Sequence, residues 1–175
     1  KYLAFAIKAI LEQTFGDYYL YILDNASTDE TQRVVESFQD KRIIYIKHKE
    51  IIGSTKNGNL AFELAKTDYL MITHDDDVMK PDLLQSEVEI LDTLKDVIMV
   101  SAGMEIIDEN DNTVKADLFG LRNDLVYRKH EYIEAFCSDN NYITCPAVMF
   151  RTSFMNDNNI RFREQVGPMG DVLCW

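Results

Sequence analysis

Short apolar runs alternate with helix-like segments through the first hundred residues, and this alternation limits the folds open to the chain. The apolar runs are continuous, as expected for strands buried on both faces of a sheet. They occupy 19–24, 42–47, 69–73 and 97–102. Apolar residues at helical spacing lie in 2–15, around Val34, Val35 and Phe38, in 54–66, and from Pro81 to Leu94. The alternation predicts an α/β fold, with an open, mostly parallel sheet flanked by helices.

Local signals mark two of the helix starts. Ser27 and Glu30 have the spacing of a capping box, which predicts that a helix begins there. Pro81 stands where a helix accepts proline, in its first turn. Ligands of open α/β sheets bind at the carboxyl ends of the strands. The polar segments 24–27 and 74–77, which follow two of the apolar runs, are therefore the first candidates for a site.

The pattern changes after residue 103. A hairpin turning at Asp111–Asn112, a weak helix over 129–137 and a strand over 146–151 are predicted there. The 175 residues contain no repeat and no flexible linker, so we expect one domain spanning 1–175 that buries about 70% of its unfolded surface. Because the chain begins at Lys1, without an initiator methionine and already in a helical pattern, and stops at Trp175 just after a candidate motif, we expect a fragment that lacks pieces at both ends.

Composition disfavours several classes of partner. Lys and Arg number 18 against 30 Asp and Glu, a net charge of −12, which argues against nucleic acid and anionic membrane surfaces as ligands. No stretch reaches the roughly 18 apolar residues of a membrane span, and no basic-then-apolar signal opens the chain. Cys137, Cys145 and Cys174 lack metal-ligand spacing and indicate buried thiols of a reducing compartment. A cytoplasmic location is therefore expected.

The acidic residues Asp75, Asp76 and Asp77 follow one of the predicted strands directly. At about 5 Å and an effective dielectric near 20, each pair repels by roughly 3 kcal/mol. A solvated turn would separate the charges, and a bound cation would neutralise them. The position after a buried strand favours the cation, and Mg²⁺ or Mn²⁺ prefers carboxylate oxygen. His74 is either a further ligand or donor, or a polar residue leaving the sheet.

Two other segments carry candidate groups. Asp24 and Asn25, at the end of the first apolar run, have side chains that hydrogen-bond a base or ribose edge, although a capped turn also accounts for them. Asp171 lies between glycines and an apolar run, a setting that raises a carboxyl pKa and suits a general base. A helix N-cap explains Asp171 equally well.

A calcium loop beginning at Asp108 is the weakest of the candidate sites. Thr113 stands where an EF-hand needs glycine, and Phe119 stands where it needs glutamate. The segment is therefore interpreted as a turn.

Five motifs in order resemble the family-2 glycosyltransferases of the GT-A fold. They lie in the stretches "YLAFAIKAILEQTFGDYYLYILDNASTDET", "GSTKNGNLAFELAKTDYLMITHDDDVMKPDLL", "PAVMFR" and "GDVLCW". The resemblance covers nearly the whole chain. It implies an inverting transfer of a sugar from a nucleotide diphosphate sugar to an acceptor hydroxyl, assisted by Mn²⁺ or Mg²⁺, in glycan or polysaccharide synthesis.

The resemblance also implies roles for residues of the donor site. Where family members often read Asp-Asp-Gly-Ser, this chain has Asp24 to Ser27, and Asn25 takes the position that contacts the base. Gly58 stands at the family's arginine position, and Lys56 is the residue expected to supply the lost positive charge to the diphosphate.

Counting back from the proline of the family pattern Asp-x-Asp-Asp-x-x-x-Pro places His74 at the first acid, with Asp76 and Asp77 at the other two. Asp76 is thereby implied as the metal ligand. Asp75 has no counterpart among the acids of the family pattern. It is expected to make the ribose or sugar contact of the family's first acid, because His74 lacks the negative charge of that residue. Asp171 matches the family's acidic base.

The resemblance further assigns residues 1–102 to the nucleotide-sugar side and 103–175 to an incomplete acceptor side. The fold's first strand, which normally precedes the opening helix, is expected to be missing from this chain. A UDP-sugar is the expected donor, and a glycan, a lipid-linked molecule or a protein the expected acceptor. The protein is then expected in the cytoplasm, either free or attached peripherally to the inner face of the membrane.

Two other functions compete with a glycosyltransferase. A nucleotide-sugar-binding domain without turnover is suggested by Asn25, Gly58 and His74, which depart from the family pattern. A receiver-like signalling domain also holds Mg²⁺ in an acidic cluster. It needs a phosphorylatable Asp and a Lys at later strand ends, whereas the run 97–102 ends in Ser101 and Ala102.

Overall fold

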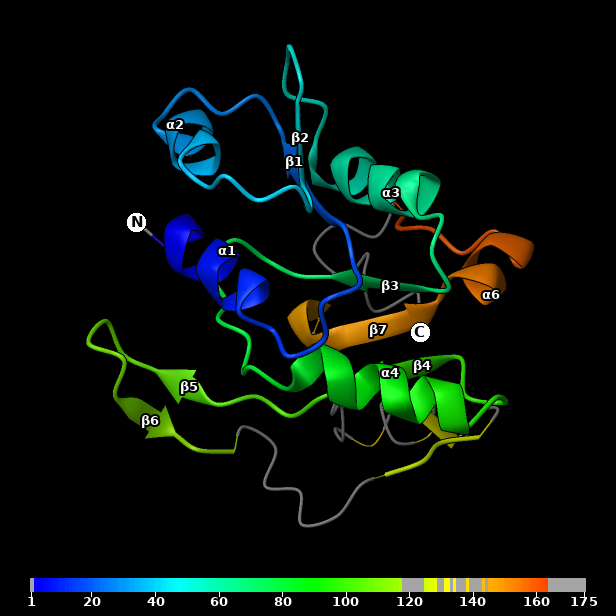
Figure 1. Cartoon of the computed structure of the whole chain (residues 1–175). Helices are drawn as coiled ribbons and strands as arrows, with labels where there is room; N and C mark the ends of the chain where they lie inside the picture. The colour runs from blue at the N-terminus through cyan, green and yellow to red at the C-terminus, as the bar shows by residue number, and fades with distance from the viewer. Residues whose placement is uncertain are drawn as a thin grey trace.

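The computed structural model describes residues 2–117, 125–128, 131–132, 134, 138, 143 and 145–163. Its elements are α1 (Leu3–Leu11), β1 (Leu20–Asp24), α2 (Thr31–Glu36), β2 (Ile43–Lys47), α3 (Ser54–Leu64), β3 (Tyr69–Ile72), α4 (Leu83–Thr93), β4 (Met99–Ser101), β5 (Ile106–Ile107), β6 (Thr113–Lys115), the 3₁₀ turn η1 (Cys145–Ala147), β7 (Val148–Arg151) and α6 (Thr152–Asp157) (Figure 1). The predicted alternation of strands and helices is confirmed over the first hundred residues.

The strands form two sheets and a separate hairpin. β1 and β2 are parallel, with Leu20 opposite Ile43 and Asp24 opposite Lys47. In the second sheet β7 lies between β3 and β4 and is antiparallel to both, so β3 and β4 run in the same direction. β5 and β6 form the hairpin predicted around Asp111–Asn112.

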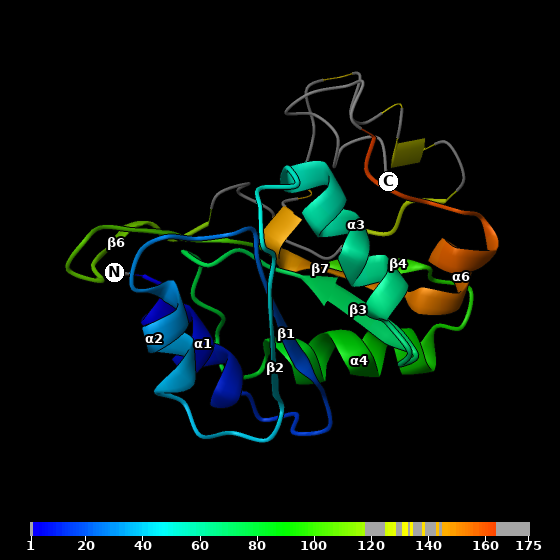
Figure 2. The same ribbon diagram turned by 90° about the horizontal axis from the view of Figure 1, so that it is seen from above.

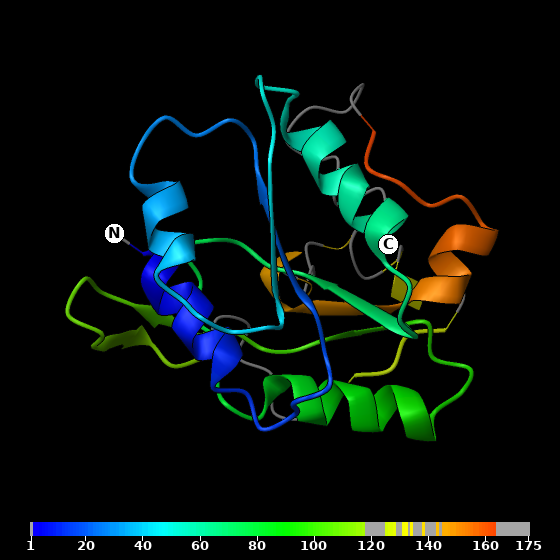
Figure 3. The ribbon, with the colours of Figure 1, turned by 45° about the horizontal axis from the view of Figure 1, so that its top comes forward.

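β7 is the central strand of the core. Val148 and Phe150 pack with Phe62 of α3 and Met155 of α6 in one cluster, whereas Met149 packs with helix α4 in another. Successive side chains of a strand point to opposite faces, so β7 is covered on both sides. Figures 2 and 3 show α3 and α4 on opposite sides of the strands β3 and β7. Each such buried side chain stabilises the fold by roughly 1.5–3 kcal/mol.

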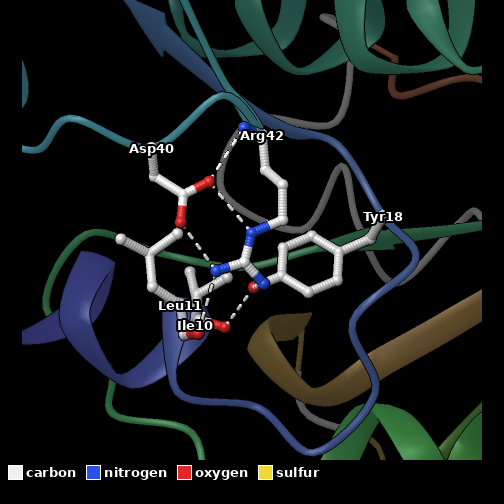
Figure 4. A network of polar contacts seen from close by, with 5 residues as sticks. All are labelled: Ile10, Leu11, Tyr18, Asp40 and Arg42. Carbon is white, nitrogen blue, oxygen red and sulfur yellow. Dashed lines mark hydrogen bonds and ion pairs between the residues drawn. The ribbon is translucent and has the colours of Figure 1, made fainter.

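A polar network joins the end of α1 to the start of β2 (Figure 4). The Arg42 guanidinium donates to the Asp40 carboxylate, to the Leu11 carbonyl (3.0 Å) and to the Tyr18 hydroxyl (2.7 Å). The Tyr18 hydroxyl in turn donates to the Ile10 carbonyl at 2.6 Å. The hydrogen bonds from Arg42 lower the pKa of Asp40 to about 2. The network fixes α1 against the β1–β2 pair, and so fixes one wall of the cavity described next.

A cavity of about 1190 Å³ lies between β1 and β3. The side chains and backbone of both strands line it, and α1, α3 and α4 contribute residues to its walls. Within the described residues, β1 is paired only with β2 and β3 only with β7, so each strand has one unpaired edge.

Several predicted boundaries were wrong. The capping box does not form, because α2 begins at Thr31, and the Ser27 N–H is held by Asp24 rather than by Glu30. Pro81 lies ahead of α4 rather than in its first turn, and helix α6 was not predicted. The predicted helix over 129–137 lies mostly outside the described residues.

The described helices are too short or too polar to cross a membrane.

Glu87 of α4 is a buried acid in an apolar setting. Its side chain is 2% exposed. The Ala102 N–H faces it but donates to the Ala147 carbonyl at 3.0 Å, which leaves both carboxyl oxygens without a partner among the described residues. Burial raises the pKa of Glu87 to about 8. The folded chain therefore holds a proton that an unfolded glutamic acid releases near pH 4.5.

We expect Glu87→Gln to stabilise the fold by about 3 kcal/mol at pH 7. The carboxyl contributes stability that is complete below pH 4.5 and is lost as the pH rises towards 8, because the folded pKa is the higher one. Urea unfolding at pH 4.5, 6, 7 and 8 measures this loss, which the variant should not show. Glu89→Gln, at an exposed position of the same helix, serves as control and should keep the wild-type pH dependence.

Candidate functional site

The carboxyl ends of β1 and β3 open onto the same cavity. Asp24, Asn25 and Ser27 line it from the end of β1, and His74 and Asp75 line it from the segment after β3. Two segments about 50 residues apart in the sequence are thus brought to one site, as the sequence predicted for an open α/β sheet.

Asp24 is held as a buried anion. It is 4% exposed, and its carboxylate accepts the Ser27 N–H (2.7 Å) and a short hydrogen bond from the Tyr45 hydroxyl. Burial favours the neutral acid, but the hydrogen bonds from Tyr45 and Ser27 outweigh it and lower the pKa of Asp24. Ala26, between them, has a left-handed φ of 64°, the conformation that glycine adopts most easily and that explains the glycine usual at this position in the family pattern.

The loop before α3 and the first turn of that helix are tied to the end of β1. The Asn57 amide donates to the Leu23 carbonyl at 2.8 Å and contacts His48 Nε2 at 3.0 Å through its oxygen. Asn25 Oδ1 accepts the backbone N–H of Ile52 at 2.8 Å. His48, Ile52 and Asn57 were not predicted as site residues, and nothing in their local pattern singles them out.

The acidic segment brings three candidate ligands together. One ligand atom each from His74, Asp76 and Asp77 lies within 4.8 Å of the other two, and His74 Nδ1 is 3.4 Å from Asp77 Oδ2. Burial, together with the charges of Asp76 and Asp75, raises the pKa of Asp77, against the opposing effect of His74. Asp75 is outside this group of three and lines the cavity instead. An imidazole and two carboxylates within this reach fit Mn²⁺ or Mg²⁺.

Gln13 fixes the segment that follows the acidic residues. It is 7% exposed, donates to the Lys80 carbonyl at 2.7 Å and accepts the Leu84 N–H at 3.0 Å. Beside it the Thr14 N–H donates to the Pro81 carbonyl at 2.8 Å. Gln13 and Thr14, just after α1, thereby anchor the segment between the acidic residues and α4, together with the start of that helix. No sequence signal identifies Gln13, because its partners are 67 and 71 residues away.

We expect Gln13→Ala to lower stability by about 2 kcal/mol, because it leaves the buried N–H of Leu84 and the partly buried carbonyl of Lys80 without their partner. Gln32→Ala is the control, because Gln32 is exposed, and it should change stability by less than about 0.5 kcal/mol. Thermal unfolding of both variants measures the difference. Equal melting temperatures for the two variants would contradict the assignment of Gln13 as an anchor.

Lys56 is exposed and is not among the described residues that line the cavity. Its expected contact with a diphosphate is untested.

Gly58 does line the cavity, and a Cβ there would lie 2.9 Å from the Phe162 ring. Asn59 holds the Phe162 backbone at both its N–H (2.8 Å) and its carbonyl (3.0 Å). A phenylalanine ring thus takes the space beside the position where the family has arginine.

Two other sequence hypotheses have different outcomes. Asp171 lies outside the described residues, and its role stays a prediction. The Asp108 carboxylate accepts the N–H groups of Asn110 (2.8 Å) and Asn112 (2.9 Å), which supports the interpretation of this segment as a turn rather than a calcium loop.

The comparison with known proteins identifies the family. The model of the protein family described as "Glycosyl transferase family 2" matches residues 1–156. The chain belongs to glycosyl transferase family 2. An uncharacterized glycosyltransferase of Methanocaldococcus jannaschii, MJ1057, is 30% identical to the chain over 118 residues, which is 66% of this chain and 41% of that protein. The family resemblance is confirmed, and the chain spans less than half the length of this family member.

Solved structures confirm the GT-A-type fold. The chain superposes on Staphylococcus aureus TarS in complex with UDP with a TM-score of 0.75 at 19% identity, covering 99% of this chain and 49% of that one. A mannosyltransferase of Pyrobaculum calidifontis, PcManGT, in complex with GDP-Man and Mn²⁺, gives a TM-score of 0.62 at 17% identity, covering 93% of this chain and 44% of the other. At these identities the likeness concerns the fold alone.

Proposed function

We propose that this chain is the donor-binding part of a glycosyltransferase that moves a sugar from a nucleotide diphosphate sugar to an acceptor hydroxyl with inversion. The observation that carries the proposal is the shared cavity. It joins the polar end of β1 to His74 and Asp75, the first two residues of the acidic segment after β3, in a chain of this family. A UDP-sugar is the proposed donor, which the complex of TarS with UDP supports.

Asp24, Asn25 and Ser27 would bind the base and ribose at the end of β1. The acidic segment would take the diphosphate, and a chain with a net charge of −12 needs a cation there to hold a polyanion. His74, Asp76 and Asp77 are the residues that would hold Mn²⁺ or Mg²⁺, with Asp76 as the principal ligand. Such an ion, when bound, supplies positive charge that stabilises the diphosphate as a leaving group.

The remaining roles follow the family pattern. Asp75 lines the cavity beside His74 and is proposed to contact the ribose or sugar. Lys56 is proposed to approach the diphosphate, and Asp171 to remove the proton of the acceptor hydroxyl during in-line attack. A glycan, lipid-linked or protein acceptor would bind on the side formed by residues 103–175. The proposed location is the cytoplasm.

A transfer assay tests this function. The protein in its full natural length is incubated with UDP-glucose or UDP-N-acetylglucosamine and Mn²⁺, and release of UDP is measured with and without a chelator. Metal-dependent release of UDP, by transfer or slow hydrolysis, is expected. Nucleotide binding without any release would instead favour a binding domain that lacks turnover.

A further inference from the structure

Asn59 of α3 holds both backbone groups of a residue far away in the sequence. Its Oδ1 accepts the Phe162 N–H at 2.8 Å, and its Nδ2 donates to the Phe162 carbonyl at 3.0 Å. Neighbouring strands hold each other by the same exchange of an N–H and a carbonyl, so the amide takes the place of a strand neighbour. A residue held at both groups is fixed in orientation as well as in position.

The Phe162 ring has a matching seat on the same helix. It meets the Phe62 ring edge-on, with the ring centroids 5.4 Å apart, and Phe62 is 2% exposed in the core. A Cβ at Gly58 would lie 2.9 Å from two carbons of the Phe162 ring, which is closer than non-bonded carbons pack. Three residues of α3, Gly58, Asn59 and Phe62, thus receive the backbone and the ring of Phe162 together.

The chain just before Phe162 is fastened to the core. The Ile160 N–H donates to the Met155 carbonyl of α6 at 2.9 Å. The Arg161 guanidinium donates to Asn156 Oδ1 at 3.0 Å and lies 5.2 Å from the centroid of the Phe62 ring. Because α6 follows the central strand β7 directly, the segment 160–162 is held at one end by the core and at the other by α3.

These contacts join the two sides of the candidate site. Gly58 and Phe162 both line the cavity. Asn57, in the first turn of α3, is hydrogen-bonded to the end of β1, so this helix is tied to the proposed nucleotide end. From Phe162 the sequence continues to Asp171, the proposed base. Asn59 therefore links the donor end of the cavity to the part of the chain that would act on the acceptor.

We infer that Asn59 is a positioning residue for sugar transfer, which acts by holding the acceptor-side segment 160–163 on the donor-side helix α3. The inference rests on the proposed function, because it concerns the transfer step at the same site. Asn59 itself is not among the described residues that line the cavity, so its loss should displace the segment without removing a contact with the nucleotide. The effect should fall on turnover and not on donor affinity.

Asn59→Ala removes both hydrogen bonds to Phe162 and tests this inference. We expect release of UDP from UDP-N-acetylglucosamine with Mn²⁺, measured in a single turnover on the full-length protein, to slow by about 10- to 100-fold. The affinity for UDP, measured by calorimetry with Mn²⁺, should stay within a factor of about two. Asn59→Asp keeps the size of the side chain but cannot donate to the Phe162 carbonyl. It should slow release in the same way, and it serves as the test if Asn59→Ala does not fold.

Two controls separate positioning from a general loss of stability. Asn158, at an exposed position after α6, also donates its amide to a backbone carbonyl, that of Phe154 at 2.9 Å, and Asn158→Ala should keep wild-type turnover. In the Asp171→Asn background, Asn59→Ala should slow release by less than about threefold, because groups that act as a unit are not additive.

Full turnover in Asn59→Ala or Asn59→Asp would overturn the inference, and so would a loss of UDP affinity as large as the loss of turnover. Undiminished slowing by Asn59→Ala in the Asp171→Asn background, or full activity of Asp171→Asn alone, would overturn it as well. A wild-type protein that releases no nucleotide from UDP- or GDP-sugars would overturn the proposed function itself, and the inference with it.

Discussion

Changing Asp171 to asparagine is expected to slow sugar transfer by about 10²- to 10⁴-fold while UDP-sugar binding is retained. The proposed role of Asp171 is to take the proton of the attacking hydroxyl, a step that belongs to the transition state and not to donor binding. A loss of turnover without a loss of affinity is the signature of a group that acts only there. Asparagine preserves the size and the hydrogen-bonding oxygen of the side chain but cannot accept the proton.

The measurement is single-turnover transfer at saturating donor, together with calorimetric titration of UDP. Asp157→Asn, which changes an exposed carboxylate of α6 in the same way, should leave both unchanged. If Asp171→Asn lowers donor affinity as strongly as turnover, Asp171 is a structural or donor-binding residue. Full activity in this variant would remove Asp171 from the mechanism.

Changing Asp76 to alanine is expected to weaken Mn²⁺-dependent UDP binding by roughly 100-fold or more, because a metal bridge to a polyanion contributes several kcal/mol. Asp76 is one of three residues whose ligand atoms lie within 4.8 Å of one another, and its two partners alone would bind the ion weakly. The fold should be unaffected, because Asp76 is exposed. Without metal the wild type is expected to bind UDP poorly. The UDP affinities of Asp76→Ala and the wild type should then be equal.

Asp96→Ala removes one exposed negative charge after α4 and provides the charge-matched control. It should leave the metal-dependent affinity within a factor of about two, because distant surface charges are screened by salt. Metal-dependent affinity that survives in Asp76→Ala would mean that the acidic segment is a solvated turn, as the sequence alone also allowed.

The architecture was predictable because its signals are local. β1 and β3 come from dense apolar runs, and each is followed by the polar residues that line the cavity. The placement of β7 between β3 and β4 was not predictable, since it depends on contacts across some 80 residues of the chain. Helix α6 has six residues, which is too short for a helical period to stand out.

The candidate site, too, was predictable where its signals are local and not where they depend on distant segments. The residue types at 24–27 and 74–77, together with their position after predicted strands, are enough to indicate ligand binding from the sequence. Gln13 and Ile52 escape such reasoning because their roles depend on partners from distant segments, and one of them acts through its backbone. The capping box was wrong for a related reason: the carboxylate of Asp24 competes successfully for the Ser27 N–H.

Isothermal titration of UDP-N-acetylglucosamine into the full-length protein, with and without Mn²⁺, most directly tests whether His74, Asp76 and Asp77 create a metal-dependent diphosphate site. Heat of binding that appears with Mn²⁺, disappears with a chelator and is lost in Asp76→Ala is the predicted result. Equal binding with and without the ion, or no heat with UDP-, GDP- and other nucleotide sugars in its presence, would contradict it.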